Sequence, residues 1–259
     1  MNLDLNHLLD GWPHEPGQIR VRKIMGRDGK EKLQLRIDLG LIQMELTGRP
    51  DGQRPHGRES YLQWHSERAI EAEAKETPFT LTSEECHELQ QEGIQYYHRY
   101  ISLFQLGDYA GVIRDTQRNL DLLSFTSRYA EQEELAWSFE SFRAYVMMMN
   151  TRAKASIELD RHDYAAAIAK IEEGRDLIAE SQASRQGAPA QCPEIEFLNQ
   201  WLEELRAKRP LSRLEQLEKE MDNAIATEAY ERAAELRDKI KAERENPVEP
   251  SLRSEDAGE

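Results

Sequence analysis

The side chains best suited to chemistry in this chain are its seven histidines, its two cysteines and its many neighbouring carboxylates. The histidines form no H-E-x-x-H pattern, and the nearest approach to a metal-binding set is His56 and His65 with Glu59. Ordinary exposed or packing roles explain these three residues more simply. Cys86 and Cys192 lie far apart and form no CxxC pair, so the sequence predicts neither a structural zinc site nor a disulfide framework.

Motifs for phosphate chemistry are also missing from the sequence. No G-x-x-x-x-G-K-[ST] loop occurs, which excludes a helicase-like ATPase of the P-loop type, and no GIY-YIG-like nuclease pattern is found. Acid pairs such as Glu84-Glu85 and Glu133-Glu134 fall on predicted helices, where a solvated helix surface accounts for them. We therefore expect a non-enzymatic protein without catalytic residues, cofactor or metal.

Charge is distributed unevenly along the chain. The net charge of -15 over 259 residues disfavours a protein that binds nucleic acid along its whole length. Residues 17–58 nevertheless hold 10 Lys and Arg against 5 Asp and Glu, which gives a basic head on an acidic body. The loop "RPDGQRPHGR" in this head presents Arg49, Arg54 and Arg58, which could contact nucleic-acid phosphates. The alternative is a loop that forms salt bridges with the acidic helices of the same chain.

The N-terminal quarter of the sequence predicts a small sheet. After a short amphipathic lead-in over residues 1–16, apolar residues alternate in "QIRVRKIMG", "KLQLRIDL" and "LIQMELTG", and Asp28-Gly29 is a turn signal. We predict a basic antiparallel sheet of about three strands within residues 17–78, covered by a helix from about residue 59 to 75. The buried face of the middle strand is expected to comprise Leu33, Leu35, Ile37 and Leu39.

Helical periodicity begins at about residue 83 and continues almost to the end of the chain. A helical bundle is predicted over residues 83–182, with Ser83 as the first N-cap and one long helix from about residue 131 to 159. The aromatic and methionine stripe of that long helix is predicted to be core: Trp137, Phe139, Phe142, Tyr145, Val146 and Met149. The remaining segments are a linker at 183–193, a connecting helix at 194–208, a helical hairpin at 210–245 and a disordered acidic tail at 246–259.

An Asp-Tyr turn occurs twice in the predicted bundle. "LFQLGDYAGVIRD" and "SIELDRHDYAAAIAK" resemble the turn of a tetratricopeptide repeat, and in the second copy Ala155, Ala167 and Gly174 fall where the two helices would touch. The copies lie 55 residues apart, whereas the repeat unit is about 34, so a regular array is not expected. The two helical hairpins are then either parts of a small bundle or the walls of a peptide-binding groove.

The segment "LEQLEKEMDNAIATEAYERAAELRDKIKAE" predicts the C-terminal hairpin. Apolar residues recur at three- and four-residue steps on both sides of a break near Ala226-Thr227, so two short helices should lie antiparallel. A hairpin of about 30 residues is smaller than the roughly 40 that fold without staples. It should therefore bury its alanine face against the rest of the chain, a second copy or a partner.

This segment resembles the UVR motif of the UvrB and UvrC proteins. The resemblance rests on the spacing of Met221, Tyr230-Glu231, Ala233-Ala234 and Leu236-Arg237-Asp238, with Glu228-Ala229 in place of a usual Leu-acid pair. The family motif is an antiparallel helical hairpin for protein–protein contact, found in excision-repair subunits and in adaptors of Clp-type proteases and stress kinases. The resemblance implies a partner-binding surface formed by Leu217, Met221, Ala224, Tyr230, Ala233, Ala234, Arg237, Asp238 and Ile240.

The sequence as a whole predicts an α+β, predominantly helical interaction protein. We expect an adaptor that docks a protein partner through the C-terminal hairpin, in DNA repair, protein quality control or stress response, and that could also self-associate. The alternative is a nucleic-acid-associated repair accessory that uses the basic head. The first residues carry no basic signal-peptide region, and no apolar run approaches the roughly 20 residues of a membrane span, so we expect a cytoplasmic location without membrane partners.

Overall fold

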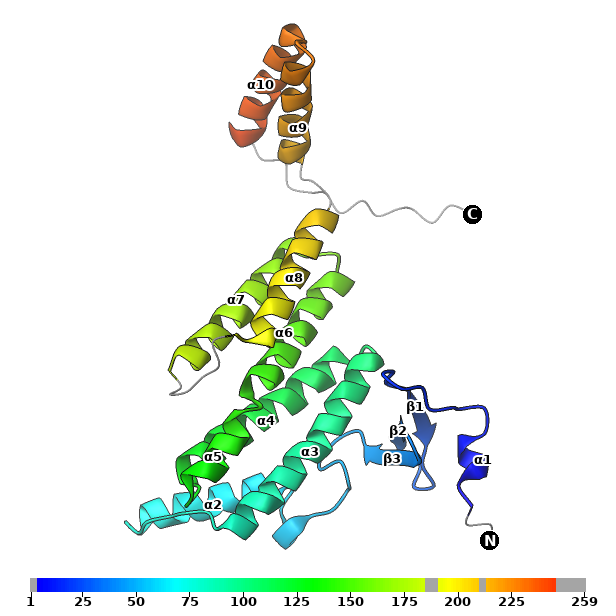
Figure 1. The fold of residues 1–259 in the computed structure, drawn as a ribbon, viewed down its shortest axis with the longest axis vertical. Helices are drawn as coiled ribbons and strands as arrows, with labels where there is room; N and C mark the ends of the chain where they lie inside the picture. The colour runs from blue at the N-terminus through cyan, green and yellow to red at the C-terminus, as the bar shows by residue number, and fades with distance from the viewer. Residues whose placement is uncertain (1–3, 185–190, 210–212, 246–259) are drawn as a thin grey trace. The chain divides into compact units, whose positions relative to one another are not determined.

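The computed structural model describes residues 4–184, 191–209 and 213–245 (Figure 1). The chain divides into two compact units, Met1–Arg206 and Ala207–Glu259. The first unit contains a three-stranded sheet and a helical bundle, and the second contains a helical hairpin, which confirms the predicted α+β, predominantly helical fold class. The predicted acidic tail at 246–259 and the middle of the predicted linker, 185–190, lie outside the described residues. Within the described residues, no helix is long and apolar enough to cross a bilayer.

The sheet has the predicted antiparallel topology, in the order β1 (Val21–Met25), β2 (Glu31–Ile37) and β3 (Gly40–Glu45). Leu33 and Leu35 of β2 are buried as predicted, with exposed fractions of 0% and 5%. The predicted alternation is wrong for Ile37 and Leu39, which are 40% and 90% exposed. The reason is local: β2 ends at Ile37, and the tight turn into β3 takes Leu39 out of the strand.

The lead-in packs on the face of the sheet that bears Arg22 and Gln34, opposite the face that bears Leu33 and Leu35. A short helix, α1 (Asn6–Leu9), precedes Trp12, whose ring lies 4.0 Å below the Arg22 guanidinium of β1. Arg22 also donates to the Leu8 carbonyl at 2.9 Å and to the Gln34 side-chain oxygen at 2.8 Å. At least this basic side chain of the sheet is therefore engaged in contacts within the basic head.

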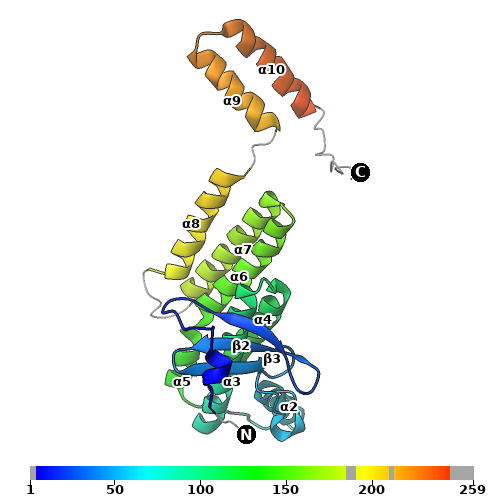
Figure 2. The same cartoon turned by 90° about the vertical axis from the view of Figure 1, so that its right-hand side faces the viewer.

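The bundle follows the sheet in the chain. Its helices are α2 (Tyr61–Ala74), α3 (Ser83–Gln105), α4 (Tyr109–Tyr129), α5 (Glu133–Glu140), α6 (Arg143–Asp160), α7 (Tyr164–Ala183) and α8 (Pro193–Lys208). The pairs α3–α4 and α6–α7 form helical hairpins, α4 packs on α6, and the sheet lies beside α3 (Figures 1 and 2). Thr82, and not the predicted Ser83, caps α3, because Thr82 and Glu85 form a capping box that satisfies two amides at once.

Two apolar clusters form the core of this unit. The larger joins the sheet to the end of α3, the start of α4 and the α6–α8 helices, and includes Leu33, Met44, Tyr100, Val112, Ala153, Ile171 and Leu198. The smaller lies around Leu81, Leu89, Leu122 and Phe139. The α2 residues Tyr61 and Leu62 pack in this second cluster and not over the sheet as predicted, because Glu92 of α3 holds the start of α2.

The long helix predicted over residues 131–159 is instead two helices, with a break at Ser141-Phe142. Near the break, the Ser138 hydroxyl donates to the Leu135 carbonyl and the Ser141 hydroxyl donates to the Ser138 carbonyl, and such local bonds compete with helix continuation. The predicted core stripe divides accordingly. Phe139, Val146 and Met149 are buried, whereas Trp137 and Phe142 are 46% and 55% exposed.

A buried ion pair links the first helical hairpin to the sheet. Arg99 of α3 and Asp115 of α4 are both about fully buried and form a two-pronged contact with N–O distances of 2.6 and 2.9 Å. The remaining guanidinium nitrogen of Arg99 donates to the carbonyls of Glu45 and Gly48 at 3.0 and 2.7 Å. One arginine therefore connects two helices and the loop after β3.

A second buried carboxylate organises the start of α2. Glu92 of α3 is 0% exposed and accepts hydrogen bonds from the Tyr61 and Leu62 amides at 2.8 and 3.2 Å. It also pairs with Arg118 of α4, and with Arg49 at 3.4 Å. A carboxylate at the start of a helix is favourable because it complements the free amides and the helix dipole.

The second hairpin, α6–α7, is closely packed, as the small residues in its sequence suggested. Ala155 and Ala167 are 0% exposed. A Cβ atom on Gly174 would lie 2.0 Å from the Thr151 hydroxyl oxygen, so glycine is needed for the two helices to approach this closely.

Candidate interaction hairpin

The second unit contains two antiparallel helices, α9 (Arg213–Ala226) and α10 (Tyr230–Glu245), joined by a three-residue turn. Glu228 in this turn has a φ of 57°, and the next amide, of Ala229, donates to the Ala224 carbonyl at 2.8 Å. This arrangement is a Schellman-type helix end. The turn brings the helices together without a glycine, because Glu228 itself takes the left-handed conformation.

The interior of the hairpin is narrow. Among the hairpin side chains that the structure describes, three are buried, with exposed fractions of 7% for Ala224, 1% for Leu236 and 6% for Ile240. They are flanked by half-buried residues on the same stripes, namely Leu214, Leu217, Met221 and Ala233. Since α9 and α10 pack extensively on each other, this stripe is the interface between the two helices.

Ion pairs join α10 to the middle of α9. Arg232 of α10 lies 3.6 Å from Glu220 of α9, and Arg244 lies 2.7 Å from Glu218. All four side chains are more than a third exposed, so each pair contributes at most about 1 kcal/mol. The apolar stripe therefore supplies most of the stability of the hairpin.

Large apolar side chains also lie on the outside of the hairpin, at its turn. Tyr230 is 66% exposed and Ile225 is 49% exposed, and they stand on either side of the turn. Along α10, Tyr230, Ala234, Arg237 and Lys241 follow three- and four-residue steps, so they share one helix face, and all are exposed. This exposed face is distinct from the buried stripe of Leu236 and Ile240.

Residues 212–245 match the family model of the UVR motif, the UvrB/uvrC motif. The C-terminal hairpin is a UVR motif. The match covers this hairpin and a small part of the 259-residue chain. Searches of curated proteins and of solved structures found no match. The UVR motif occurs in DNA-repair proteins of the UvrB and UvrC type and in protein-interaction proteins, and the resemblance seen in the sequence is confirmed to this extent.

The structure places the predicted partner-binding residues of the UVR motif on two different surfaces. Ala224 and Ile240 are buried in the hairpin, and three further residues are half-buried beside them: Leu217, Met221 and Ala233. The others are exposed, namely Tyr230, Ala234, Arg237 and Asp238. Arg237 and Asp238 lie 3.3 Å apart as neighbours in the chain, and both are about 70% exposed. The exposed set is the part of the prediction available to a partner.

Ile225 is a large exposed apolar residue of the UVR motif that the predicted partner-binding set did not include. It follows Ala224 directly and lies four residues after Met221, so it falls at the edge of the apolar stripe of α9. An apolar residue at the edge of a stripe, next to a turn, is the signal that could have identified it.

The three arginines of the basic head occupy different environments. Arg49 is 8% exposed and pairs with Asp51 at 3.1 Å and with Glu92 at 3.4 Å, so its guanidinium is engaged within the chain. Arg58 is exposed and pairs with Glu67 of α2. Arg54 is exposed, and among the described residues it has no carboxylate partner. Contact with nucleic acid stays a prediction, and Arg54 and Arg58 are the residues placed for it.

The histidines next to this loop have packing roles. His56 stacks on Trp64 with ring centroids 4.7 Å apart. His65 is 1% exposed, its Nδ1 lies 2.9 Å from an Arg68 guanidinium nitrogen, and its Nε2 has no hydrogen-bond partner among the described residues. Burial lowers the pKa of His65 to about 4. No group of three His, Cys, Asp or Glu among the described residues is arranged to hold a metal ion.

Proposed function

We propose that this protein is a non-enzymatic, cytoplasmic adaptor that docks a protein partner through the exposed face of its UVR hairpin. We expect it to act in one of the processes in which UVR motifs occur: DNA repair first, or protein quality control or stress response. The docking face comprises Ile225 and Tyr230 on either side of the turn, Ala234 and Arg237 on the exposed face of α10, and Asp238, the exposed neighbour of Arg237.

The exposure of Tyr230 and Ile225 carries this proposal. Tyrosine combines a large apolar ring with a polar hydroxyl and loses little conformational entropy on binding, so it is enriched in binding hot spots. At 66% and 49% exposure, these two side chains offer apolar surface that the narrow interior of the hairpin does not use. Arg237 and Asp238 add donors and acceptors beside them, as in the polar rim of an interface.

The proposal is tested by affinity purification of the full chain from its native cell, followed by quantitative mass spectrometry. Three baits are compared: the wild type, a chain without residues 210–245, and a Tyr230→Ser/Ala234→Glu variant. A partner retained by the wild type and lost by both other baits supports docking through this face. Partners retained equally by all three baits contradict it. Ala233 is left unchanged because it is half-buried, and a charge there would disturb the hairpin itself.

A matched control uses an exposed residue on another side of α10. Lys239→Glu introduces a negative charge about 140° round the helix from Ala234 and about 100° from Asp238, away from the docking face. This variant should retain the partner. If it loses the partner as well, added negative charge and not the docking face explains the result. Size-exclusion chromatography with light scattering on the same variants reports whether the partner is a second copy of this chain.

A further inference from the structure

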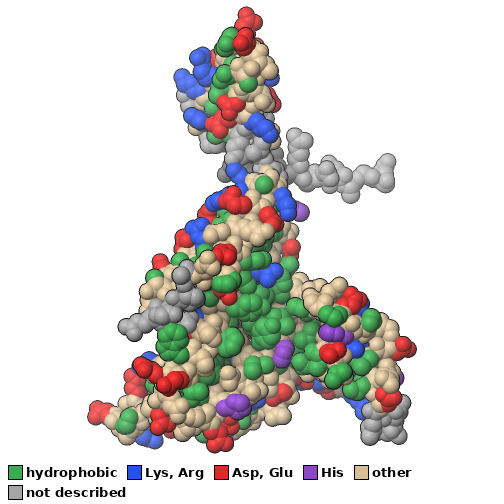
Figure 3. Space-filling view, in the orientation of Figure 1, with side chains coloured by type: hydrophobic (Ala, Val, Ile, Leu, Met, Phe, Trp, Pro, Cys, Tyr) green, Lys and Arg blue, Asp and Glu red, His purple; other side chains and the backbone are tan. Residues whose placement is uncertain are grey.

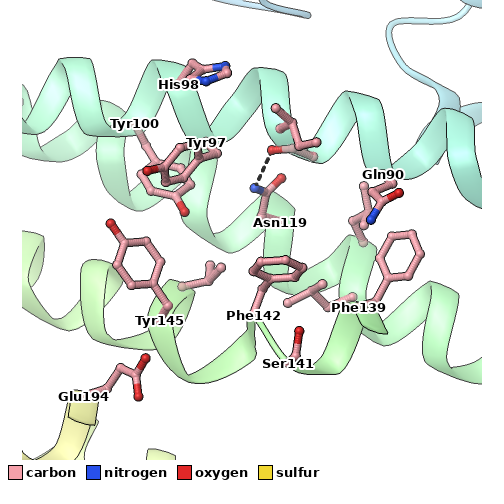
Figure 4. Close-up of a pocket in the computed structure, with 15 residues that line it drawn as sticks. Gln90, Tyr97, His98, Tyr100, Asn119, Phe139, Ser141, Phe142, Tyr145 and Glu194 are labelled. Atoms are coloured by element: carbon pink, nitrogen blue, oxygen red, sulfur yellow. Dashed lines mark hydrogen bonds between the residues drawn. The ribbon is translucent and has the colours of Figure 1, made fainter. Parts of the chain in front are cut away.

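The first unit has an apolar cavity of its own, between α3, α4, α5, α6 and the start of α8. Its volume is 610 Å³, and its walls include Ile94, Tyr97, Phe142, Tyr145 and Glu194. In Figure 4, Tyr97 and Tyr100 of α3 lie across the space from Tyr145 of α6, and Glu194 of α8 stands at one end. In Figure 3, hydrophobic side chains gather on the face of the molecule over these helices. The cavity is large enough for a bulky apolar side chain.

Several large side chains at this cavity are exposed although they are apolar. Ile94 is 41% exposed, Tyr97 is 37% and Phe142 is 55%. Phe142 is accessible because the helix breaks immediately before α6. Tyr145 and His98, which also line the cavity, are half-buried, and burial raises the pKa of Tyr145 and lowers that of His98. An apolar group that enters such a site and displaces water is bound favourably, because apolar surface is removed from water.

Arg152 lies about two helical turns beyond Tyr145 on the same face of α6, outside the residues that line the cavity. The cavity and the surface from it to Arg152 are called the groove below. The Arg152 guanidinium lies between two rings, 4.5 Å from the Phe104 centroid on α3 and 4.9 Å from the Phe197 centroid on α8. Its one hydrogen-bond contact is with the Met149 sulfur at 3.5 Å, and no carboxylate among the described residues pairs with it. A guanidinium has five N–H donors and prefers a two-pronged contact with a carboxylate or phosphate. Arg152 is therefore a half-buried cation without its natural partner.

The spacing of these two features suits an extended chain. Tyr145 and Arg152 are seven residues apart on α6, which corresponds to about 10 Å along a helix. An extended peptide covers about 10 Å in three residues. Gln90, at the far end of the cavity, is half-buried and its side-chain amide makes no hydrogen bond among the described residues, so it is available to a peptide backbone.

We propose that the groove between α3, α6 and α8 binds an extended segment of a partner protein, with a large apolar side chain in the cavity and a carboxylate on Arg152. The charge complementarity of Arg152 and the about 10 Å separation favour a peptide in which an acidic group stands about three residues from an aromatic or large aliphatic residue. This site is separate from the UVR hairpin and does not depend on the function proposed for it.

The test is selection of a displayed library of random heptapeptides on the full chain. Enrichment of sequences with an acidic residue or a terminal carboxylate about three positions from an aromatic or large aliphatic residue is the expected result. The enriched peptide is then synthesised with a fluorescent label, and binding is measured by anisotropy, together with a version in which the acid is replaced by its amide. We expect about a ten- to hundred-fold loss for the amide version, as for other charged hydrogen bonds.

Variants of the groove decide whether Arg152 is the contact. Arg152→Gln should bind acid and amide peptides equally, and Phe142→Ser should weaken both. Arg161→Gln, in which an exposed arginine with a local Glu158 pair is changed, should behave as the wild type. The proposal is overturned if no peptide is enriched, if enriched peptides keep their acid preference with Arg152→Gln, or if light scattering shows that a second copy of the chain occupies the groove. Tryptophan fluorescence confirms that each variant is folded.

Discussion

The α6–α7 and α9–α10 hairpins use the same turn and differ in how much they bury. In both, a non-glycine residue with positive φ ends the first helix, His162 at 59° and Glu228 at 57°, and a tyrosine begins the second. The following amide reaches back to the Glu158 or Ala224 carbonyl in the same manner. Local turn chemistry is thus sufficient to form a helical hairpin, whether or not other helices cover it.

The interiors of the two hairpins are not alike. In α6–α7, Ala153, Ala167, Ile171 and Ile178 are all 0% exposed, and α4 also packs on α6. In the UVR hairpin, the tightly buried side chains are Ala224, Leu236 and Ile240, and Tyr230 is left exposed. The first unit is therefore stabilised by side chains buried between several packed helices. The UVR hairpin is stabilised by one apolar stripe between its two helices. A hairpin held by one stripe keeps a second face available for a partner.

The largest expected effect is in the buried charges of the first unit. Asp115→Asn keeps the shape of the side chain but leaves Arg99 buried without its counter-charge, so the free energy of unfolding should fall by about 3–5 kcal/mol. Urea denaturation followed by tryptophan fluorescence measures this unit selectively, because all four tryptophans precede residue 207. Asp238→Asn in the hairpin is the matched control. It is followed by hydrogen exchange of α10, because the hairpin holds no tryptophan, and it should change stability by less than about 0.5 kcal/mol, because its ion pair is exposed. A loss below about 1 kcal/mol for Asp115→Asn would contradict this role of the buried pair.

Low pH should lower the stability of the first unit through His65, which has no counterpart in the hairpin. The pKa of His65 is lowered to about 4 by burial first, with a further decrease from the positive charges of Arg68 and His56, whereas the Glu85 carboxylate opposes the shift. Between pH 6.5 and 4 the unfolded chain binds a proton at His65 and the folded chain does not, so stability is complete above pH 6.5 and decreases as the pH falls towards 4. The decrease should amount to at most about 3 kcal/mol.

The difference between wild type and His65→Gln, measured by tryptophan fluorescence at several pH values, isolates this effect from carboxylate titration. The variant should show a flatter pH profile below pH 6.5. The hairpin contains no histidine, so hydrogen exchange of α10 should lack this component. If the pH profiles of wild type and His65→Gln are parallel, a lowered pKa of His65 does not contribute to the loss of stability at low pH.

The single stripe of the hairpin should make it sensitive to one truncation. Leu236→Ala removes the most buried side chain of the second unit and should cost about 2–3 kcal/mol, because a cavity replaces apolar contacts. Hydrogen exchange across α9 and α10 should approach the rate of an unfolded chain, while the tryptophan transition of the first unit stays in place. Leu177→Ala on α7 is the comparison, and a small effect is expected because Leu177 is 48% exposed. Unchanged exchange in α10 after Leu236→Ala would disagree with the single-stripe description.

The smallest expected effect concerns the caps of the two turns. Asp163 caps α7 by accepting a hydrogen bond from the Ala166 amide at 2.9 Å, and Ala229 at the matching place before α10 has no such side chain. Ala229→Asp should therefore slow hydrogen exchange in α10, with a gain of about 1 kcal/mol, and Asp163→Ala should cost about as much in α7. Changes of the same sign in both variants would mean that the two turns are not equivalent.

Much of the fold could be predicted from patterns that act over a few residues. Period-two alternation predicted the three strands, and the Asp-Tyr pairs predicted the turns before α4 and α7. The three small positions of α6–α7, Ala155, Ala167 and Gly174, and the UVR hairpin followed from the resemblance of short segments to known motifs. These predictions succeeded because turn, cap and periodicity preferences depend on neighbours in the chain. The third copy of the turn, at Glu228-Ala229, was not seen as an equivalent because alanine replaces the aspartate.

Features that depend on distant residues could not be predicted. The helix break at Ser141-Phe142 could not be recognised in the sequence, because the apolar stripe continues through it. The break leaves Phe142 exposed. The pairing of Glu92 with the start of α2, and of Arg99 with Asp115, joins residues far apart in a sequence rich in charges, where many other pairings were equally permitted. Burial is what selects among them, because an unpaired charge is tolerated in water and not in a core.

By itself, the sequence determined the strands, most of the helices and the presence of a UVR hairpin, because these are encoded in short-range periodicity and turn residues. The tertiary structure alone decided which side chains remain at the surface. It enclosed Ala224 and Ile240 and left Tyr230 and Ile225 exposed, and it placed Arg152 between two rings without an acidic partner. The physical reason is that exposure depends on all the helices that pack around a residue, and a linear pattern specifies only the helix to which the residue belongs.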